Sequence, residues 1–497
     1  MSFRSLIQEL ITRNSTVLVL GLGVSGIETA QFLHRIGLKA RCIERTPEVE
    51  FRAKSKFARR VDEMKSAGVE FRFGVDGERV AEELAGVELC VVSPGVSLES
   101  AVVGALRRHG KKIVSELELG IELRSEVTAV VTGSNGKSTT VTLLHEMLSA
   151  GGIPTTLCGN IGTPVVTDIT PESLQERRSD SANPSAWLVV EASSYQLEAC
   201  QVLKPKIGVF LNLSDNHLER HGSMERYFAA KAQLFALQDQ TDIAILNCDD
   251  LYTKRLVQSV SGTVATFGIG AALSQSKHHA QIQFNPRGGQ DEVSILIGGV
   301  REVVSALGTR LIGLHNRYNI AAAALAARIA GVQSSTIQEV VRTFQPLEHR
   351  IEFVRGGADG SGPLVINDSK ATTVAAAAAA VQCVRESFPS QRLQLMIGGF
   401  AKAGSWDPLL NLLVQHSSSL LPVICFGKDG PLLASHCRER GVPWQIAPSV
   451  AGAVEASRTL ANGSSDVVQL FSPGCASFDE FSDFEARGRC FKDLVQQ

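Results

Sequence analysis

Several classes of protein are excluded by what this sequence lacks. It has no run of about 18 uninterrupted apolar residues, so no segment is suited to cross a membrane as a helix. The net charge is only −2, which provides no basic surface for a nucleic acid. The ten cysteines contain no C-x-x-C pair, a pattern that favours reduced thiols over disulfides or a zinc site. Residues 1–10 lack the apolar core of a signal peptide, so we expect a cytoplasmic protein.

Length and composition instead predict a globular protein of several domains. The chain has 497 residues, of which 44% are hydrophobic and 20% are charged. At about 150 residues per domain, this length corresponds to roughly three domains.

The most informative motif is Thr132-Gly-Ser-Asn-Gly-Lys-Ser-Thr-Thr140, between an apolar run and a helical pattern. Its two glycines let successive backbone amides converge on phosphate oxygens at the start of the helix. Lys137 supplies a charge for the β- and γ-phosphates, and Ser138 or Thr139 supplies a hydroxyl for Mg²⁺. The loop is shorter than the usual P-loop, and its ordinary alternative is a tight turn before an exposed helix. The motif predicts a protein that uses ATP.

A second glycine-rich motif, G-x-G-x-x-G over residues 21–26, also joins a strand-like run to a helical pattern. Glu44 ends the next strand about 20 residues later, where a Rossmann domain places an acid beside a ribose hydroxyl. A further run ends in Ser93-Pro94-Gly95 at the same edge of the predicted sheet. The first domain is therefore predicted to bind a nucleotide diphosphate.

Short apolar runs alternate with helical segments along the whole chain, which predicts an α/β fold with parallel sheets. We expect a Rossmann-like domain over residues 1–113, a central P-loop ATPase-like domain over residues 114–346, and a C-terminal Rossmann-like domain over residues 347–497. The poorly patterned residues 274–299 predict an exposed hairpin or insertion.

Three side chains of the central domain each allow a catalytic and an ordinary interpretation. Glu191 ends a strand where a phosphate-loop fold coordinates Mg²⁺, but a glutamate there also caps helices. His217 either ligates a second metal or is a solvated loop histidine. Lys231 lies on an amphipathic helix, where a surface lysine is the usual case. These residues alone leave both interpretations open.

Four later motifs each follow or cap a predicted strand or helix. Taken singly they are weak, because Arg350 is also read as a surface charge and Asp368 as a turn-former. Their order after the phosphate loop is what favours a common function. The motifs are His315-Asn316-Arg-Tyr-Asn319, Leu347-Glu-His-Arg350, Asn367-Asp-Ser-Lys370-Ala-Thr372 and Gly398-Gly-Phe-Ala-Lys402.

In this order the motifs resemble those of the Mur ligases, ATP-dependent enzymes that add amino acids to peptidoglycan precursors. The resemblance runs over nearly the whole chain. The motif Ser472-Pro-Gly-Cys-Ala-Ser477-Phe-Asp-Glu-Phe481 is most similar to that of the members that add D-glutamate. The resemblance implies a monomer that ligates D-glutamate to UDP-N-acetylmuramoyl-L-alanine through an acyl phosphate, with ATP and two Mg²⁺ ions.

The resemblance also changes the interpretation of the first domain, because in this family the glycine-rich motif holds the uridine diphosphate of a sugar substrate. The implied UDP-sugar contacts are Gly23, Val24, Ser25, Gly26, Glu44, Arg45, Ser93, Pro94, Gly95 and Asn160. The implied ATP contacts are Gly133, Ser134, Asn135, Gly136, Lys137, Ser138, Thr139, Asn316, Asn319, Arg350 and Asp368.

Metal ligands, amino-acid contacts and catalytic groups are implied in the same way. Lys231 matches a lysine that is carbamylated in this family, and a carbamate converts its positive charge into an anionic metal ligand. The implied metal ligands are Ser138, Glu191, His217 and Lys231 as its carbamate. The implied amino-acid contacts are Lys370, Thr372, Lys402, Ser477, Phe478 and Phe484. The implied catalytic residues are Lys137, Lys231, His217, Lys370 and Lys402.

The sequence departs from the family pattern at two places: Phe400-Ala401 stands where Asp-Gly is expected, and Glu44-Arg45-Thr46 differs from the usual uridine site. Cys475 lies within the amino-acid motif, either as a reactive thiol or, more commonly, as a packed inert one. The alternatives are a Mur or folylpolyglutamate-type ligase for another amino acid, a non-catalytic nucleotide-sugar sensor, and a plain P-loop ATPase.

Overall fold

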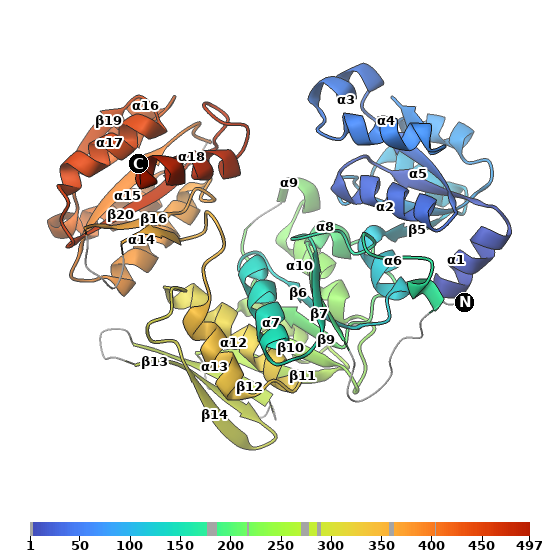
Figure 1. The fold of residues 1–497 in the computed structure, drawn as a ribbon, viewed down its shortest axis with the longest axis horizontal. Coiled ribbons are helices and arrows are strands. Elements are labelled where there is room, and N and C mark those ends of the chain that lie inside the picture. Colours follow the sequence, from blue (N-terminus) through green and yellow to red (C-terminus); the bar gives the residue numbers. More distant parts are fainter. Residues whose placement is uncertain are drawn as a thin grey trace. The chain divides into compact units, whose positions relative to one another are not determined.

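The structure is a computed structural model with two compact units, each of which is described by itself. The described residues are 3–175, 186–215, 218–269, 278–285, 290–356, 362–402 and 404–497. The first unit comprises Met1–Ile282, Val293–Val304 and Tyr318–Val340, and the second comprises Gln283–Glu292, Ser305–Arg317 and Val341–Gln497. Figure 1 shows three sheets along the chain, each flanked by helices.

The N-terminal sheet, blue in Figure 1, has five strands in the order β3-β2-β1-β4-β5, and all its pairs are parallel. The order reverses between β1 and β4, which makes that point the topological switch of the sheet. The strands are β1 (Thr16–Leu20), β2 (Lys39–Glu44), β3 (Glu70–Phe73), β4 (Val87–Val92) and β5 (Lys112–Ser115). The helices are α1 (Phe3–Thr12), α2 (Val24–Arg35), α3 (Glu48–Lys54), α4 (Ala58–Ser66), η1 (Gly77–Glu83) and α5 (Ala101–Arg108).

Strand β1 shows why the strands of this sheet are continuously apolar in the sequence. Val17 and Val19 pack into one hydrophobic core cluster, and Leu18 and Leu20 pack into another. Because successive side chains of a strand point to opposite faces, both faces of the sheet are covered. Burial of each such side chain contributes roughly 1.5–3 kcal/mol to folding.

The central sheet has nine strands in the order β14-β13-β12-β11-β10-β9-β6-β8-β7. From β7 to β12 the neighbouring strands are parallel. The strands are β6 (Val127–Thr132), β7 (Thr155–Gly159), β8 (Trp187–Glu191), β9 (Ile207–Phe210), β10 (Ile243–Asn247), β11 (Thr263–Gly268), β12 (His278–Asn285), β13 (Gln290–Ile297) and β14 (Val300–Ser305).

The helices of the central part follow its strands. They are α6 (Glu116–Leu123), α7 (Lys137–Ala150), η2 (Ser173–Gln175), α8 (Ser194–Leu197), α9 (Leu218–His221), α10 (Met224–Ala232), η3 (Gln233–Phe235), α11 (Leu251–Leu256), α12 (Leu314–Ile329) and α13 (Ser334–Thr343). Helix α6 begins at the N-cap Ser115, whose side chain accepts a hydrogen bond from the amide of Glu118.

The described residues of the stretch 274–299 belong to this sheet. Strands β12 and β13 lie within it, and the two-residue turn Gly298-Gly299 leads from β13 into the edge strand β14. Both turn glycines have positive φ, as a tight hairpin turn requires. The predicted hairpin is therefore present, as an extension of the central sheet, while residues 274–277 and 286–289 lie outside the described residues.

The C-terminal sheet has six strands in the order β15-β16-β20-β17-β18-β19, and only the edge pair β15/β16 is antiparallel. The strands are β15 (Glu352–Arg355), β16 (Leu364–Asn367), β17 (Arg392–Gly398), β18 (Val423–Phe426), β19 (Trp444–Ala447) and β20 (Val467–Gly474). The helices are α14 (Val374–Ser387), α15 (Asp407–Gln415), η6 (Ser417–Ser419), α16 (Gly430–Glu439), α17 (Val450–Ala461) and α18 (Phe484–Gln496).

Both faces of the C-terminal sheet are buried as well. Leu395 and Ile397 of β17 pack into one core cluster, whereas Met396 between them packs into another. In the described part of the chain, no helix is long and apolar enough to cross a membrane.

Candidate functional site

The predicted sugar-nucleotide loop lies at the switch point of the N-terminal sheet. Gly21 follows β1 and Ser93 follows β4, and the Ser93 hydroxyl donates to the Gly21 carbonyl at 2.8 Å. A Cβ on Gly26 would lie 1.9 Å from the Gly21 oxygen and 2.7 Å from Ser93 Oγ. Only glycine therefore fits at position 26, and helix α2 starts tightly against the loop. Pro94 is half-buried and Gly95 is exposed beside it.

Helix α2 offers its N-terminus to an anion at this edge. Its N-cap, Gly23, makes no side-chain cap, Val24 is exposed, and Ser25 is half-buried. The first turn of such a helix favours a negative charge. The carboxylate of Glu44 binds the loops around it: its Oε2 accepts from the amide of Leu22 and its Oε1 from that of Thr46, each at 3.0 Å.

Glu44 therefore fastens the glycine loop to the end of β2. Its neighbour Arg45 is exposed at the same strand end. The structure brings the glycine motif, Ser93 and Glu44 together, and places Asn160 beside Glu191 instead.

The phosphate loop joins β6 to α7 and is held by the neighbouring loop after β9. The amide of Asn135 donates to Asn212 Oδ1 at 2.9 Å, and Asn212 Nδ2 donates back to the Asn135 carbonyl at 3.1 Å. Ser134 Oγ accepts from the amide of Ser214 at 3.0 Å. Asn212 and Ser214 were not identified from the sequence, because polar side chains after a strand give no sign that they bind the phosphate loop.

Gly136 occupies a position that no other residue fits. It is the N-cap of α7 with a φ of +84°, and a Cβ there would lie 2.2 Å from Asn319 Oδ1. Asn319, from α12, also accepts from the Thr140 hydroxyl at 3.3 Å. The structure therefore brings Asn319 onto the phosphate loop. Ser138 and Thr139 are buried at the start of α7.

Two lysines donate to carbonyl oxygens of the phosphate loop. Lys137 Nζ lies 2.9 Å from the Gly133 oxygen and 3.1 Å from the Ser134 oxygen. Lys231 Nζ, from α10, lies 2.9 Å from the same Gly133 oxygen, and only 1% of Lys231 is exposed. Burial, and then the charge of Lys137, hold the pKa of Lys231 well below its usual value, while Glu191 acts in the opposite direction. The amine is therefore far less prone to carry a proton than a surface lysine.

Glu191 has a carboxylate oxygen that fits a metal ion. The residue ends β8 and is 2% exposed, and its Oε1 accepts from Asn160 Nδ2 at 2.8 Å. Its Oε2 is buried without a hydrogen-bond partner in the described structure. A buried carboxylate oxygen without a partner is costly, and such oxygens are the ligands that Mg²⁺ prefers. Among the described residues no three His, Cys, Asp or Glu side chains form a metal cluster, and His217 lies outside them.

Arg220 connects the central part of the chain to the sugar-nucleotide loop. Its guanidinium donates to the Val96 carbonyl at 2.8 Å, forms an ion pair with Glu198 and lies 4.9 Å from the centre of the Tyr195 ring. Val96 follows the predicted Ser93-Pro94-Gly95 turn directly. Arg220 was not identified from the sequence, since an arginine in a polar segment reads as a surface charge.

A second group of side chains leads from the same segment to the phosphate loop. His221 Nε2 is 3.0 Å from Ser194 Oγ, and its ring stacks on Tyr227 with centroids 5.1 Å apart. The Tyr227 hydroxyl is 3.1 Å from Ser134 Oγ, and Lys231 Nζ lies 4.8 Å from the Tyr227 ring centre. Tyr227 thus supports both the loop and Lys231.

In the second unit, the structure brings Arg350 and Asp368 together. Asp368 Oδ2 accepts from the Ser472 hydroxyl at 2.8 Å, and Oδ1 accepts from the amide of Ile351 at 3.3 Å. Burial raises the pKa of Asp368 to about 7, while these hydrogen bonds and the charge of Arg350 act against that rise. Asn316, at the start of α12, donates to the Ile312 carbonyl at 2.8 Å.

The predicted amino-acid contacts follow the ends of three adjacent strands. Lys370 follows β16, Ser477 follows β20 and Lys402 follows β17, and these strands are neighbours in the parallel part of the sheet. The Lys370 ammonium lies 3.8 Å from the centre of the Phe484 ring. Thr372 is half-buried before α14.

The departure at Phe400-Ala401 leaves the backbone of this loop ordered. Phe400 and Ala476 exchange two backbone hydrogen bonds of 2.9 and 3.0 Å, and the amide of Ala401 donates to Asp429 Oδ2 at 2.7 Å. The Phe400 and Phe478 side chains are 43% and 73% exposed.

Ser477 is buried and Lys402 is exposed beside these residues. Cys475 is fully buried, and burial raises the pKa of its thiol to about 12, which favours the packed, inert interpretation.

A cavity of about 650 Å³ elsewhere in the second unit is lined by residues such as Phe284, Arg310 and Phe388, none of which the sequence placed in the site.

Comparison with known proteins gives the family. The family model described as "Mur ligase MurD-like, N-terminal domain" matches residues 15–115, and the one described as "Mur ligase middle domain" matches residues 131–327. The chain is 34% identical to UDP-N-acetylmuramoylalanine--D-glutamate ligase of Acidobacterium capsulatum over 488 residues, covering 97% of this chain and 96% of that protein. The chain belongs to the Mur ligase family. The D-glutamate ligase of Koribacter versatilis is 33% identical and covers 98% of each chain.

Solved Mur ligases share the fold. UDP-N-acetylmuramate-alanine ligase from Thermotoga maritima has a TM-score of 0.56 at 15% identity and covers 97% of this chain and 99% of its own. A second solved structure comes from Acinetobacter baumannii and is UDP-N-acetylmuramoylalanyl-D-glutamyl-2,6-diaminopimelate--D-alanyl-D-alanyl ligase. It has a TM-score of 0.55 at 18% identity, and the match covers 84% of this chain and 86% of that one. The predicted three-domain α/β fold and the prediction of a ligase are confirmed.

Proposed function

We propose that this Mur ligase joins D-glutamate to the alanyl carboxylate of UDP-N-acetylmuramoyl-L-alanine and converts ATP to ADP and phosphate in doing so. The observation that carries the proposal is the similarity over 97% of the chain to a relative named for D-glutamate ligation. The reaction class requires two steps: the alanyl carboxylate attacks the γ-phosphate to give an acyl phosphate with ADP as the leaving group, and the amine of D-glutamate then displaces phosphate and loses a proton to form the amide.

The phosphate loop is the proposed ATP site. Residues 133–139 and the start of α7 supply backbone amides for the phosphates, and Lys137 supplies a charge beside the γ-phosphate. Asn319 lies against the loop, and Arg350 and Asp368 lie together in the second unit. We assign these residues, with Asn316, to the nucleotide.

Lys231 is proposed to act as its carbamate. The lysine is buried and its lowered pKa favours the uncharged amine, which is the form that adds carbon dioxide. The carbamate would stand near Glu191, whose charge acts on Lys231 and whose Oε2 has no partner in the described structure. Ser138 is buried at the start of α7, after the phosphate loop. These residues, with His217, would hold two Mg²⁺ ions. Bound Mg²⁺ would neutralise phosphate charge during transfer.

The two remaining substrates are assigned to opposite ends of the chain. The glycine loop, Glu44, Arg45 and the turn from Ser93 to Gly95 would hold the uridine diphosphate, and Asn160 the sugar side. Lysine and hydroxyl groups near the strand ends of the C-terminal sheet suit a substrate with two carboxylates. The D-glutamate residues are Lys370, Thr372, Lys402, Ser477, Phe478 and Phe484. We propose a cytoplasmic monomer that acts on these small molecules.

The test is phosphate release from ATP with UDP-N-acetylmuramoyl-L-alanine, comparing D-glutamate, L-glutamate and no amino acid. We expect release only with D-glutamate, with the product mass raised by one glutamyl unit. Lys137→Ala is the control, which should abolish release while UDP-sugar binding, measured by calorimetry, persists. Equal release with both glutamates, or with neither, would reject the D-glutamate assignment.

A further inference from the structure

A strained segment surrounds Arg350. His349 and Ile351, on either side of it, have positive φ values of 65° and 51°. A non-glycine residue in this region is unfavourable, and a β-branched one such as isoleucine is a clear outlier. Each is unfavourable and persists only where the surroundings hold it. The contacts that hold this segment therefore bear on the position of Arg350.

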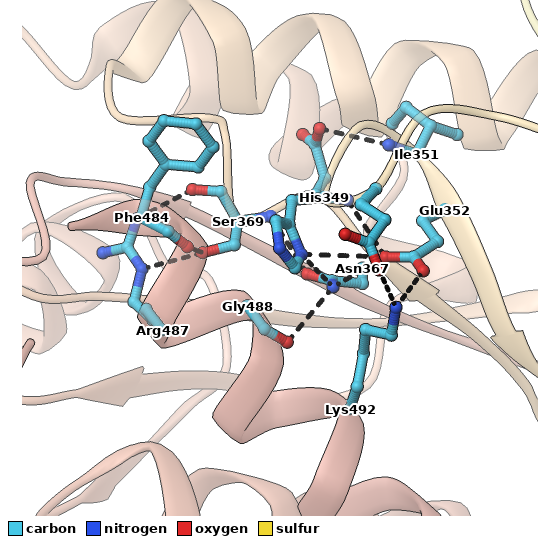
Figure 2. A network of polar contacts seen from close by, with 11 residues as sticks. His349, Ile351, Glu352, Asn367, Ser369, Phe484, Arg487, Gly488 and Lys492 are labelled. Atoms are coloured by element: carbon cyan, nitrogen blue, oxygen red, sulfur yellow. Dashed lines mark hydrogen bonds and ion pairs between the residues drawn. The ribbon is translucent and has the colours of Figure 1, made fainter. Parts of the chain in front are cut away.

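The carboxylate of Glu352 is the centre of those contacts (Figure 2). Its Oε2 accepts from the amide of His349 at 3.0 Å and from Asn367 Nδ2 at 3.1 Å. Asn367 Nδ2 also donates to His349 Nδ1 at 2.9 Å and to the Gly488 carbonyl at 3.3 Å. One acidic side chain thus binds both the backbone and, through Asn367, the ring of His349.

Lys492 of the last helix, α18, completes this arrangement. Its Nζ lies 2.6 Å from Glu352 Oε1 and 2.8 Å from Glu348 Oε1. The Lys492 and Glu352 side chains are 21% and 14% exposed, whereas Glu348 is 69% exposed. The inner pair, Lys492 with Glu352, is therefore the better shielded from water. The close-up shows the lysine reaching up from α18 to this carboxylate.

The same segment also reaches the predicted amino-acid site. The amide of Lys370 donates to the His349 carbonyl at 3.0 Å, and the amide of Ile351 donates to Asp368 Oδ1 at 3.3 Å. The strained segment thus contains Arg350, a predicted nucleotide contact. It also forms hydrogen bonds with Asp368, another predicted nucleotide contact, and with Lys370, a predicted D-glutamate contact.

We propose that Lys492, acting through Glu352, is a positioning residue that holds residues 348–352 in their strained conformation and so fixes Arg350 relative to Lys370. Lys492 is not among the residues assigned to either ligand; it keeps the carboxylate of Glu352 in place for the His349 amide. The roles given to Arg350 and Lys370 rest on the proposed function, but the holding of the segment does not.

Amide hydrogen exchange tests the holding itself without any substrate. We expect Lys492→Met to speed exchange at the amides of His349, Ile351 and Lys370 by roughly tenfold, which corresponds to about 1.4 kcal/mol of local opening. Lys492→Arg should restore the slow rate. Arg489→Met removes an exposed charge one turn earlier on α18 that acts on Glu348 and His349 through space. It is the matched control and should leave these amides unchanged. Unchanged exchange in Lys492→Met, with its fold intact by calorimetry, would overturn the proposal.

Binding assays test the consequence for the ligands. Calorimetry with ADP should show roughly tenfold weaker binding to Lys492→Met and unchanged binding to Glu348→Gln, since the exposed outer partner is dispensable. In turnover assays, KM for ATP and for D-glutamate should rise while KM for the UDP-sugar stays constant. The hydrogen-exchange and ADP-binding measurements use no amino acid, so they test the positioning role of Lys492 even if the enzyme proves to use an amino acid other than D-glutamate. Faster exchange with unchanged ADP affinity would overturn the link to Arg350.

Discussion

At the scale of single residues, burial decides the chemistry of the ionisable side chains. Lys231 sits on the phosphate loop as a buried amine of lowered pKa, and Glu116 and Asp368 are buried carboxyls whose pKa values are raised to about 7. In each case desolvation is the largest cause, because it disfavours the charged form. Only Lys231 and Asp368 were singled out from the sequence.

Lys231→Ala should be inactive and should regain part of its activity with added acetate. The alanine leaves space at the phosphate loop, and a small carboxylate would replace the proposed carbamate there. Phosphate release measured against acetate concentration checks this. Lys206→Ala, at a half-exposed lysine ahead of β9, is the control. Full activity of Lys231→Ala without acetate would contradict the carbamate.

Glu116→Gln should make the stability of the protein less dependent on pH. The folded protein keeps a proton on Glu116 up to about pH 7, whereas the unfolded chain releases it near the usual pKa of 4.5. Between these values the folded state binds the extra proton, so stability falls as pH rises, by roughly 3 kcal/mol. Removing the titration should therefore raise stability at pH 8 but not below pH 4.5.

Calorimetry at pH 5 and pH 8 checks the Glu116 prediction through the difference in Tm between the two conditions. Glu118 and Asp368 have raised pKa values as well, so the dependence should shrink rather than vanish. Glu455→Gln, at an exposed position on α17, should leave the difference as it is. If the difference in Tm between pH 5 and pH 8 were the same in Glu116→Gln as in the unaltered protein, the raised pKa of Glu116 would be contradicted.

The sequence identified residues by their place after a strand, and it could not identify their partners. Glu44 was expected to meet a ribose, and nothing in the sequence indicated that both its oxygens also accept from backbone amides of the surrounding loops. Lys492 gave no signal at all, because a lysine on an amphipathic C-terminal helix reads as solvent-exposed. Contacts between segments distant in the chain, which set both roles, leave no periodicity in a single sequence.

At the scale of elements, the phosphate loop depends on the absence of a side chain at position 136. Gly136→Ala should abolish ATP use, since the added Cβ would lie 2.2 Å from Asn319 Oδ1 in a left-handed backbone. The free energy of unfolding should fall by about 1–3 kcal/mol. Gly152→Ala is a matched control, because Gly152 has a similar φ of +74° and nothing within 4 Å. ATP turnover and urea unfolding are measured for both variants. Because Gly152→Ala introduces only backbone strain, the comparison separates that strain from the clash between the added Cβ and Asn319.

A pair of arginines offers a further test at this scale. Arg220→Gln should raise KM for the UDP-sugar by roughly tenfold, because it removes the bond that holds the loop after Ser93. Arg226→Gln is the control: Arg226 reaches the same region through Glu99, but its side chain is 68% exposed. Exposed ion pairs contribute little. Similar KM values for the two variants would rule out a special role for Arg220.

Continuously apolar strands can be recognised in the sequence, whereas strands that contain turn-forming residues cannot. The apolar runs 187–191 and 207–210 form β8 and β9, since buried parallel strands are continuously apolar. β20 was missed, because it ends in Ser472-Pro473-Gly474, which reads as a loop. The register with β17 shifts at this end, and such an irregularity lets a proline sit in an inner strand.

At the scale of the whole molecule, the N-terminal sheet and most of the central sheet form one unit. Arg4 donates to the carbonyls of Leu123 and Leu174, and Arg35 donates to those of Thr167 and Ile169. The first and second predicted domains are thus fastened to each other through backbone groups.

Thermal unfolding of the intact chain should show two calorimetric transitions, one for each unit. UDP-N-acetylmuramoyl-L-alanine should raise only the transition of the first unit, because a ligand stabilises the folded part that binds it. Scans with and without the UDP-sugar check this. A single transition whose van't Hoff and calorimetric enthalpies agree would show that the units unfold together.

The contact between α18 and the strained segment has a consequence for how this chain varies over generations. A Cβ on Gly488 would lie 2.2 Å from His349 Nδ1, so the two positions share one space although they are far apart in the sequence. A side chain at position 488 therefore needs a smaller residue at position 349. Homologous chains that have lost the glycine should also have lost the imidazole, whereas loss of the imidazole alone leaves the glycine free to stay.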